Sequence, residues 1–185
     1  MSTIMIENVR LSFANAIWTA KAFSEGQKPK YSCNLLLDKD KDAEQIKSFK
    51  AKIKEKAKEA FGEKIPKGLP VCLEDGESKP YDGYENAMFI RAASNMRPQI
   101  IDRDRSALVE EDGKPYAGCY VNAAVSLWAM DNKYGKRISC NLTALQFVKD
   151  GDRFGDGGIN TNEHFKDISK ETIADVEDDD DDFLS

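Results

Sequence analysis

The chain has 185 residues and a formal net charge of −6, and its length suits one domain with a core of its own. Seven of its acids lie in the last eleven residues; without them 26 acids face 27 bases, so residues 1–174 carry a net charge of +1. No run approaches the roughly 18 apolar residues of a membrane span, and the N-terminus lacks the basic and apolar regions of a secretory signal. We therefore expect a soluble protein of a reducing cytoplasm.

Alternating apolar and polar residues predict β-strands over residues 4–13, 30–37, 88–93, 97–102, 118–130 and 136–148. In the first of these strands the alternation changes phase near Glu7 and Asn8, which indicates a β-bulge. Residues 15–26 and 63–86 are predicted to be loops, the first with exposed aromatic side chains and the second punctuated by glycine and proline. Residues 131–135 form a turn, so the last two strands make a long hairpin.

One helix is predicted after the second strand. Apolar residues from Ile46 to Phe61 recur at helical spacing, Gly62 would end the helix, and Asp40 or Asp42 would cap its start. The helix also carries the lysines Lys47, Lys50, Lys52, Lys54 and Lys56. These suit a nucleic-acid contact, but we favour a solvated amphipathic face, because such faces are common.

These elements predict a mainly β protein with one α-helix. Half a dozen strands and a single helix suit a small barrel or a curled sheet that the helix caps, and the absence of βαβ alternation disfavours a doubly wound sheet. Residues 1–166 would form this domain. Residues 167–185 would be a disordered acidic tail, because repulsion and hydration keep five consecutive aspartates out of a core.

The four cysteines, Cys33, Cys72, Cys119 and Cys140, do not have the CxxC spacing of a zinc site, and the chain has a single histidine, His164. Three of the cysteines, all except Cys72, lie in apolar, strand-like runs and are expected to be small buried residues. We therefore expect neither a metal nor another cofactor.

Catalytic motifs are also missing. The sequence has no nucleophile elbow and no Walker loop, and its one histidine lies in a glycine-rich region where it would make a poor general base. Asp102, Asp104 and Glu110 would suit magnesium as in a nuclease. Arg103 and Arg105 alternate with these acids, however, and a salt-bridged loop explains that pattern more simply. We therefore expect a protein that is not an enzyme.

Aromatic and cationic residues interleave on the predicted loops and strand faces. Single-stranded nucleic acid needs this mixture, because bases stack on aromatic rings, for about 1–3 kcal/mol per base, while Lys and Arg follow the phosphates. The candidate stacking residues are Trp128, Tyr116, Tyr120, Tyr31 and Trp18. The candidate phosphate contacts are Arg97, Arg103, Arg105, Lys136, Arg137, Lys30 and Arg91. The tyrosines have an equally good alternative as half-buried packing residues.

Several runs of residues resemble one known family. They are VRLSFAN (residues 9–15), NMRPQIID (95–102), YAGCYV (116–121), GKRISCNL (135–142) and QFVKDG (146–151). Together they are similar to the single-stranded DNA-binding proteins of tailed phages of the Enc34 type. The resemblance covers most of residues 4–158 and implies an OB-fold with an inserted helix that binds single-stranded DNA without sequence preference. The layout is also similar to that of the phage T7 single-stranded DNA-binding protein.

The acidic C-terminus matches that layout, because five aspartates precede a terminal aromatic, here followed by the two extra residues Leu184 and Ser185. The residues concerned are Asp178, Asp179, Asp180, Asp181, Asp182 and Phe183. We expect the aspartates to stand in for phosphates and the ring for a base, so that the tail competes with DNA. The tail would also recruit replication or recombination proteins, since acidic tails often are interaction tails. A tail that only aids solubility is the simpler alternative.

The sequence thus predicts a protein that protects single-stranded DNA during phage replication or recombination, in the cytoplasm of the infected bacterial host. Its expected partners are single-stranded DNA and replication or recombination proteins, with no membrane; a homodimer stays open. A protein-interaction module that is recruited through its acidic tail, without affinity for DNA, is the competing hypothesis.

Overall fold

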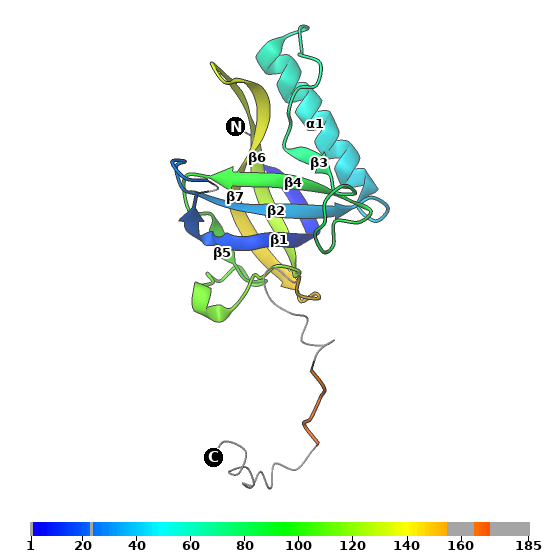
Figure 1. Ribbon diagram of the computed structural model, residues 1–185, viewed down its shortest axis with the longest axis vertical. Helices are drawn as coiled ribbons and strands as arrows, with labels where there is room; N and C mark the ends of the chain where they lie inside the picture. Colours follow the sequence, from blue (N-terminus) through cyan, green and yellow to red (C-terminus); the bar gives the residue numbers. More distant parts are fainter. Residues whose placement is uncertain (1, 23, 155–164, 171–185) are drawn as a thin grey trace, which may run out of the picture.

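The computed structural model describes residues 2–22, 24–154 and 165–170, in which seven strands and one α-helix follow one another (Figure 1). They are β1 (Ile4–Lys21), β2 (Lys30–Asp38), α1 (Ala43–Phe61), β3 (Leu73–Asp75), β4 (Ala87–Ser94), β5 (Gln99–Ile101), β6 (Tyr120–Asn132) and β7 (Gly135–Lys149), with a short 3-10 helix η1 (Glu110–Asp112) before β6. No helix in these ranges is long and apolar enough to cross a membrane. Of the predicted acidic tail, residues 167–185, the structure describes residues 167–170; Asp178 to Phe183 lie outside the described residues.

Five of the strands close into a barrel. β1 pairs with β2 and β6, β2 pairs with β4, and β6 pairs with β7, all of them antiparallel. A parallel pairing of β4 with β7, through Ala92–Cys140 and Ala93–Asn141, closes the ring. The OB-fold is a small five-stranded barrel of this kind. The prediction of a mainly β, OB-fold-like barrel with one inserted helix is confirmed, since α1 lies between the second and third barrel strands.

The alternation of the strands fills the barrel. Inward-facing side chains from all five barrel strands have almost no exposed surface, among them Leu11, Leu35, Ile90, Val121 and Leu142. Full burial of one such side chain contributes about 1.5–3 kcal/mol. The interior is therefore a packed core, and any binding surface must lie on the outside of the barrel or at its ends.

All four cysteines are free and buried. Burial raises the pKa of Cys33 to about 12 and that of Cys119 to about 11. The pKa of Cys140 is also raised, by a hydrogen bond with Cys72 and by burial. The prediction that Cys33, Cys119 and Cys140 are buried residues is confirmed. In the part of the chain that the structure describes, no three His, Cys, Asp or Glu side chains group so that they could hold a metal ion.

Helix α1 buries one face on the barrel through Ile46, Phe49, Ile53 and Ala57 and ends, as predicted, at Gly62, whose φ is 67°. The start of the helix differs from the prediction. Asp42 is the N-cap residue, but its carboxylate caps no helical N–H and accepts instead from the Asp38 backbone (2.9 Å). The carboxylate of Asp38 accepts hydrogen bonds from the backbone N–H groups of Asp40 and Lys41, and these bonds lower the pKa of Asp38.

The connection between α1 and β4 covers part of the outside of the barrel. Tyr84 from this segment is completely buried against Leu36, Phe89 and Phe154. Its hydroxyl donates to the Ser12 Oγ (2.9 Å). Residues 63–86 were predicted as loop throughout, which is wrong at the three residues of β3, a strand too short to show an alternation. This cover leaves only part of the face of β1, β2 and β4 open.

Strand β1 is longer than predicted. Residues 15–21 were expected in a polar loop, but the strand continues to Lys21 and buries Ile17 completely. The register of β1 against β2 shifts twice after Ser12, and Phe13 has a φ of 51°, so the period-2 pattern is broken. The bulge predicted near Glu7 and Asn8 is confirmed by a register shift against β6 and by a φ of 53° at Asn8.

Candidate nucleic-acid interface

A row of small side chains crosses the outside of the barrel from strand to strand. The pairings place next to one another Ala16 of β1, Ser32 of β2, Ala93 of β4, Asn141 of β7 and Ser126 of β6. Each of the five has at least one direct neighbour on its strand in the core, so alternation turns the five outward; these neighbours are Ile17, Cys33, Ala92, Cys140, Leu142, Val125 and Leu127. We call this row the small-residue strip. Ala16 and Ser126 are only 9% and 6% exposed, whereas Ser32, Ala93 and Asn141 are half-buried. Because all five side chains are small, an extended chain would approach the sheet most closely at the three half-buried positions.

A ring and a cation border the strip toward the β6–β7 hairpin. Trp128 of β6 pairs with Ser139 of β7. On the other side of β7, the parallel pair Ala92–Cys140 places Arg91, the residue before Ala92 on β4, next to Ser139. Trp128 is half-buried and packs outside the core, whereas the Arg91 side chain is 53% exposed. Arg91 Nε donates to Glu74 Oε2 at 2.7 Å, so one acid engages it on the surface. The structure therefore brings together two of the predicted contacts, one stacking and one phosphate-binding.

The hairpin beyond Trp128 adds further cations. Arg137 is half-buried, and within the described residues its Nε is enclosed without a hydrogen-bond acceptor. A buried donor without a partner costs about 1–3 kcal/mol, so an acceptor brought by a ligand would be favourable there. Lys136 lies over the Phe61 ring (5.2 Å), toward α1. At the tip Lys133 lies over the ring of Tyr134, which is 80% exposed.

A second ring and cation border the other end of the strip. Arg97 lies over the Trp18 ring at 5.6 Å and donates to the Trp18 carbonyl oxygen at 3.2 Å. The register places Trp18 and Tyr31 between the pairs Ala16–Ser32 and Lys21–Lys30, so Lys30 lies next to them. Trp18 was expected to be exposed on a loop, but it is half-buried and packs against the core. Met96 beside Arg97 is 78% exposed and was not predicted as a contact.

The predicted contacts Tyr116 and Tyr120 lie elsewhere, at the far end of β6. Tyr120 and Trp128 are eight residues apart on the strand, about 26 Å. The Tyr116 hydroxyl donates to Asp150 Oδ1 (2.7 Å), and burial, together with this carboxylate, raises the pKa of Tyr116. Arg153 lies over the Tyr116 ring at 4.4 Å.

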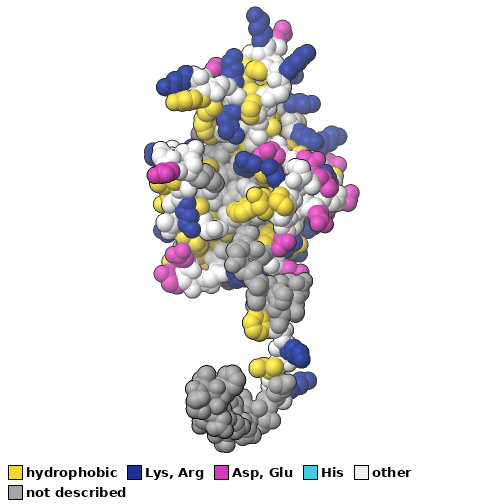
Figure 2. Space-filling view, in the orientation of Figure 1, with side chains coloured by type: hydrophobic (Ala, Val, Ile, Leu, Met, Phe, Trp, Pro, Cys, Tyr) yellow, Lys and Arg dark blue, Asp and Glu magenta, His cyan; other side chains and the backbone are white. Residues whose placement is uncertain are grey.

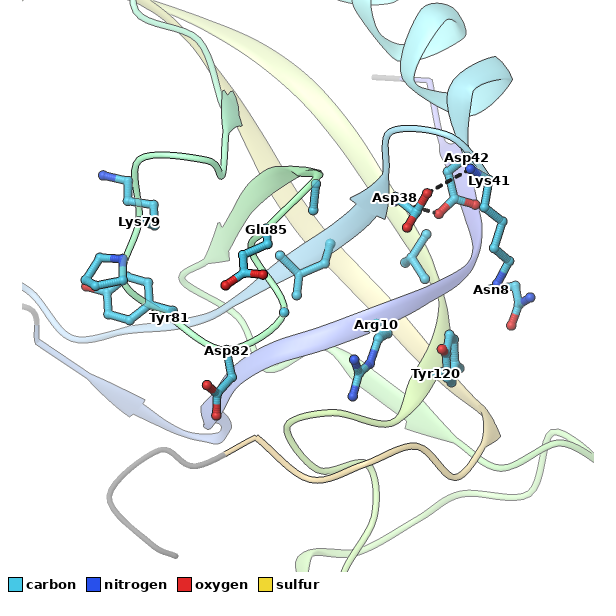
Figure 3. Close-up of a pocket in the computed structure, with 15 residues that line it drawn as sticks. Asn8, Arg10, Asp38, Lys41, Asp42, Lys79, Tyr81, Asp82, Glu85 and Tyr120 are labelled. Carbon is cyan, nitrogen blue, oxygen red and sulfur yellow. Dashed lines mark hydrogen bonds between the residues drawn. The ribbon is translucent and has the colours of Figure 1, made fainter. Parts of the chain in front are cut away.

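Three cations surround the Tyr120 ring, and Figure 3 shows Arg10 and Tyr120 side by side on neighbouring strands. Lys149, Lys41 and Arg10 lie 4.6, 5.1 and 5.8 Å from its centroid. Arg10 is held by the backbone, since it donates to the Gly118 carbonyl (3.1 Å) and to the Asp152 carbonyl (2.6 Å). The adjoining cavity of about 540 Å³ is lined by the acids Asp38, Asp42, Asp82 and Glu85 and by the bases Arg10, Lys41 and Lys79. This acidic lining does not favour a phosphate.

Arg103 and Arg105 are exposed in the turn after β5, apart from both borders of the strip. The salt bridge of this turn is not made by the arginines, as the sequence suggested, but by Lys114 and Asp102 (3.1 Å). The pKa of Asp102 is lowered by the Arg103 backbone N–H and by Lys114. Asp104 accepts from Ser106 instead of facing Asp102 across a metal site.

The surface charge also divides the molecule. Figure 2 shows lysine and arginine side chains gathered at the top, over α1 and the hairpin, and acidic side chains at the right, near the end of β2 and the turn that follows it. The roles of the twelve predicted contacts stay predictions. The geometry nevertheless separates those that border the strip from Tyr116 and Tyr120 at the far end of β6 and from Arg103 and Arg105 in the turn after β5.

Residues 2–184 match the family model described as the single-stranded DNA-binding protein of Enterobacter phage Enc34. The chain belongs to this family. Protein p50 of Acyrthosiphon pisum secondary endosymbiont phage 1 is 39% identical over 175 residues, which cover 90% of this chain and 94% of that protein. The prediction of the family is confirmed, and so is the prediction that the chain is not an enzyme, because the family is one of DNA-binding proteins.

Solved structures agree with this membership. The phage Enc34 single-stranded DNA-binding protein in complex with single-stranded DNA is 29% identical and superposes with a TM-score of 0.74, over 83% of this chain and 89% of that one. The phage T7 protein gp2.5, another single-stranded DNA-binding protein, shares the fold, with a TM-score of 0.53 at 12% identity over 94% of this chain and 99% of that one.

Proposed function

We propose that this protein binds single-stranded DNA without sequence preference during phage replication or recombination, in the cytoplasm of the infected host cell. The observation that carries the proposal is the small-residue strip with a ring and a cation at each border. Trp128 and Trp18 would stack bases, while Arg91, Arg137 and Arg97 would meet phosphates. The Enc34 protein of the same family, solved with single-stranded DNA, supports it.

The strip suits a single strand better than a duplex. Side chains read a duplex mainly from its grooves, which an α-helix or a β-ribbon must enter. The strip instead presents small side chains, two of them alanines, on a curved sheet, where an unpaired strand can lie with its bases turned toward the bordering rings. Stacking on the bordering rings is tolerant of sequence because every base has a π-face, so we expect little dependence on sequence.

A titration of a labelled oligo-dT with the full chain, followed by fluorescence anisotropy, tests the proposal. We expect saturable binding at micromolar protein concentration. The affinity should fall as salt is added, because lysine and arginine side chains that contact phosphates release the counterions condensed on the DNA, and added salt opposes this release. A mixed-sequence oligonucleotide of the same length should bind similarly, and a duplex less tightly. Absence of salt-dependent binding to single strands would leave the protein-interaction module as the better function.

The finer part of the proposal concerns the acidic C-terminus. Its aspartates would compete with DNA for the cations at the strip and would recruit replication or recombination proteins when DNA displaces them. Removal of residues 175–185 should then tighten binding, most of all at low salt, where seven charges are least screened. An unchanged affinity at low salt would remove competition from the proposal.

A further inference from the structure

Helix α1 presents a line of lysines to solvent. They are Lys47, Lys50, Lys54 and Lys58, all exposed, and their spacing of three and four residues places them along one side of the helix. The acids Glu44 and Glu55 lie three residues before Lys47 and Lys58, at one edge of this line, and Glu59 pairs with Lys56 (3.6 Å). None of the four lysines forms a salt bridge within 4 Å of a described carboxylate, although Lys50 lies near enough to Asp75 to contribute to the lowered pKa of that carboxyl. We call this line the lysine stripe.

An apolar groove of about 640 Å³ runs beside the stripe, between α1 and the start of β4. Its floor is aliphatic, made by Ala43, Ile46, Ala51 and Met88, and the first three stripe lysines line it. The acid in its lining, Asp75, is already bonded to Lys39 at 3.0 Å. We call this the α1 groove. A helix face that is merely solvated needs lysines but no apolar groove, so the two features together indicate a ligand with acidic and apolar parts.

We infer that residues 175–185 of the same chain dock in the α1 groove. This segment carries seven acids and no base, and it ends in Phe183, Leu184 and Ser185. Its carboxylates would lie along the lysine stripe, and its two apolar side chains would cover the aliphatic floor. A nucleic-acid strand fits less well, because the lining contains no aromatic ring on which a base could stack.

The chain is long enough for this contact. Phe154 is fixed on the barrel, where Arg10 lies over its ring at 4.2 Å and where it packs in one cluster with Leu36 of β2. Strand β2 ends at Asp38, directly before Lys39 of the groove lining. Roughly 30 residues separate Phe154 from Phe183, and a chain of that length spans at most about 100 Å. Helix α1 is only about 29 Å long, so the segment reaches every part of the groove.

Docking there would have a consequence beyond the proposed function. None of the five strip residues lines the α1 groove, and Met88 is five residues, or about 17 Å, from Ala93 on β4. The two sites can therefore be occupied together. An acidic segment displaced from the strip by DNA would remain on its own molecule, held at α1, until a replication protein with a stronger basic and apolar surface takes it.

Carbodiimide cross-linking of the full chain tests the inference, since it joins a carboxylate to a lysine amine only when the two are in contact. We expect mass spectrometry to find the C-terminal peptide joined to Lys47, Lys50 or Lys54, both in the free protein and with saturating oligo-dT. The free-protein arm does not depend on DNA binding, so failure of the proposed function would be seen separately. Joined peptides only at Lys28, Lys30 or Lys136 would overturn the inference.

A pair of matched variants sharpens the result. Ala51→Glu places a carboxylate in the groove and should reduce the α1 cross-links severalfold by repulsion, whereas Ala60→Glu adds the same charge to an exposed position outside the groove and should leave them unchanged. Equal cross-links in both variants, loss of the α1 cross-links on addition of oligo-dT, or α1 cross-links confined to covalent dimers would each contradict docking of the same chain.

Discussion

The two ends of strand β6 carry the same kinds of side chain and put them to different uses. At the hairpin end, Trp128 stands on the outside of the barrel beside Arg91, next to a strip of small residues. At the other end, the Tyr120 ring is surrounded by Arg10 and two lysines. There the arginine is bonded to two backbone carbonyls, and a carboxylate holds the neighbouring Tyr116. Aromatic and cationic residues side by side thus make either a binding surface or a structural clamp.

The partners of the cations decide which of the two forms. Arg10 connects β1 to the segment after β7, where Phe154 and Gly151 pack closely; a Cβ on Gly151 would lie 2.3 Å from the Gly118 carbonyl oxygen. Two of the five N–H groups of Arg10 are bonded to backbone carbonyls, so a phosphate would have to compete with these bonds for the guanidinium. In the part of the chain that the structure describes, Arg91 has in contrast one acidic partner, the exposed Glu74, which a phosphate can replace at little cost.

The largest expected difference between the two ends is in DNA affinity. Trp128→Ala should weaken binding of oligo-dT by about 1–3 kcal/mol, the usual contribution of one stacked base. Tyr120→Ala, the matched change at the other end, should leave affinity nearly unchanged. Anisotropy titrations of both variants at one salt concentration give the comparison, and thermal unfolding controls for folding. A greater loss of affinity in Tyr120→Ala would reverse the assignment of the two ends.

Stability should show the opposite order. Arg10→Ala removes two hydrogen bonds from a charged group to backbone carbonyls and should destabilise the fold by about 2 kcal/mol. Arg91→Ala removes only an exposed ion pair, so its cost should stay below about 1 kcal/mol. Urea unfolding of the two variants measures both values. Equal destabilisation would mean that Arg91 is also a structural residue.

Much of the fold followed from the sequence. Alternation located all five barrel strands, and helical spacing together with Gly62 located α1 and its end. The second half of β1 was missed because two register shifts interrupt its alternation while Ile17 remains in the core. The OB-fold closure itself was available only through the family resemblance, since a parallel pairing of two distant strands leaves no local signal.

The site could be predicted only in part. Composition located the rings and cations at both ends of β6, but it could not show which of them were already bonded. The partners of Arg10 are the backbone carbonyls of Gly118 and Asp152, and a carbonyl oxygen is present at every position of the sequence. The small-residue strip was also not visible, because its members come from five separate strands and none is distinctive alone.

Salt dependence gives a finer distinction between the cations. If Arg91 contacts one phosphate, Arg91→Ala should lower the slope of log K against log salt by about 0.7. Lys149→Ala, which removes a cation 4.6 Å from the Tyr120 centroid, should leave the slope unchanged. Titrations of both variants over a range of salt concentrations measure this. Equal slopes for the two would show that net charge matters and position does not.

The smallest effect concerns Glu74, the acid that engages Arg91 at 2.7 Å. Glu74→Gln should free the guanidinium for phosphate and tighten binding about two- to fivefold at low salt, which corresponds to an exposed ion pair of up to about 1 kcal/mol. Glu59→Gln is the matched control, because it removes the same charge from the Lys56 pair on α1. A tightening confined to Glu74→Gln would place Arg91 on the DNA path. If both variants tighten equally, the gain comes from overall charge, and the hairpin end of β6 loses its strongest claim to be the binding surface.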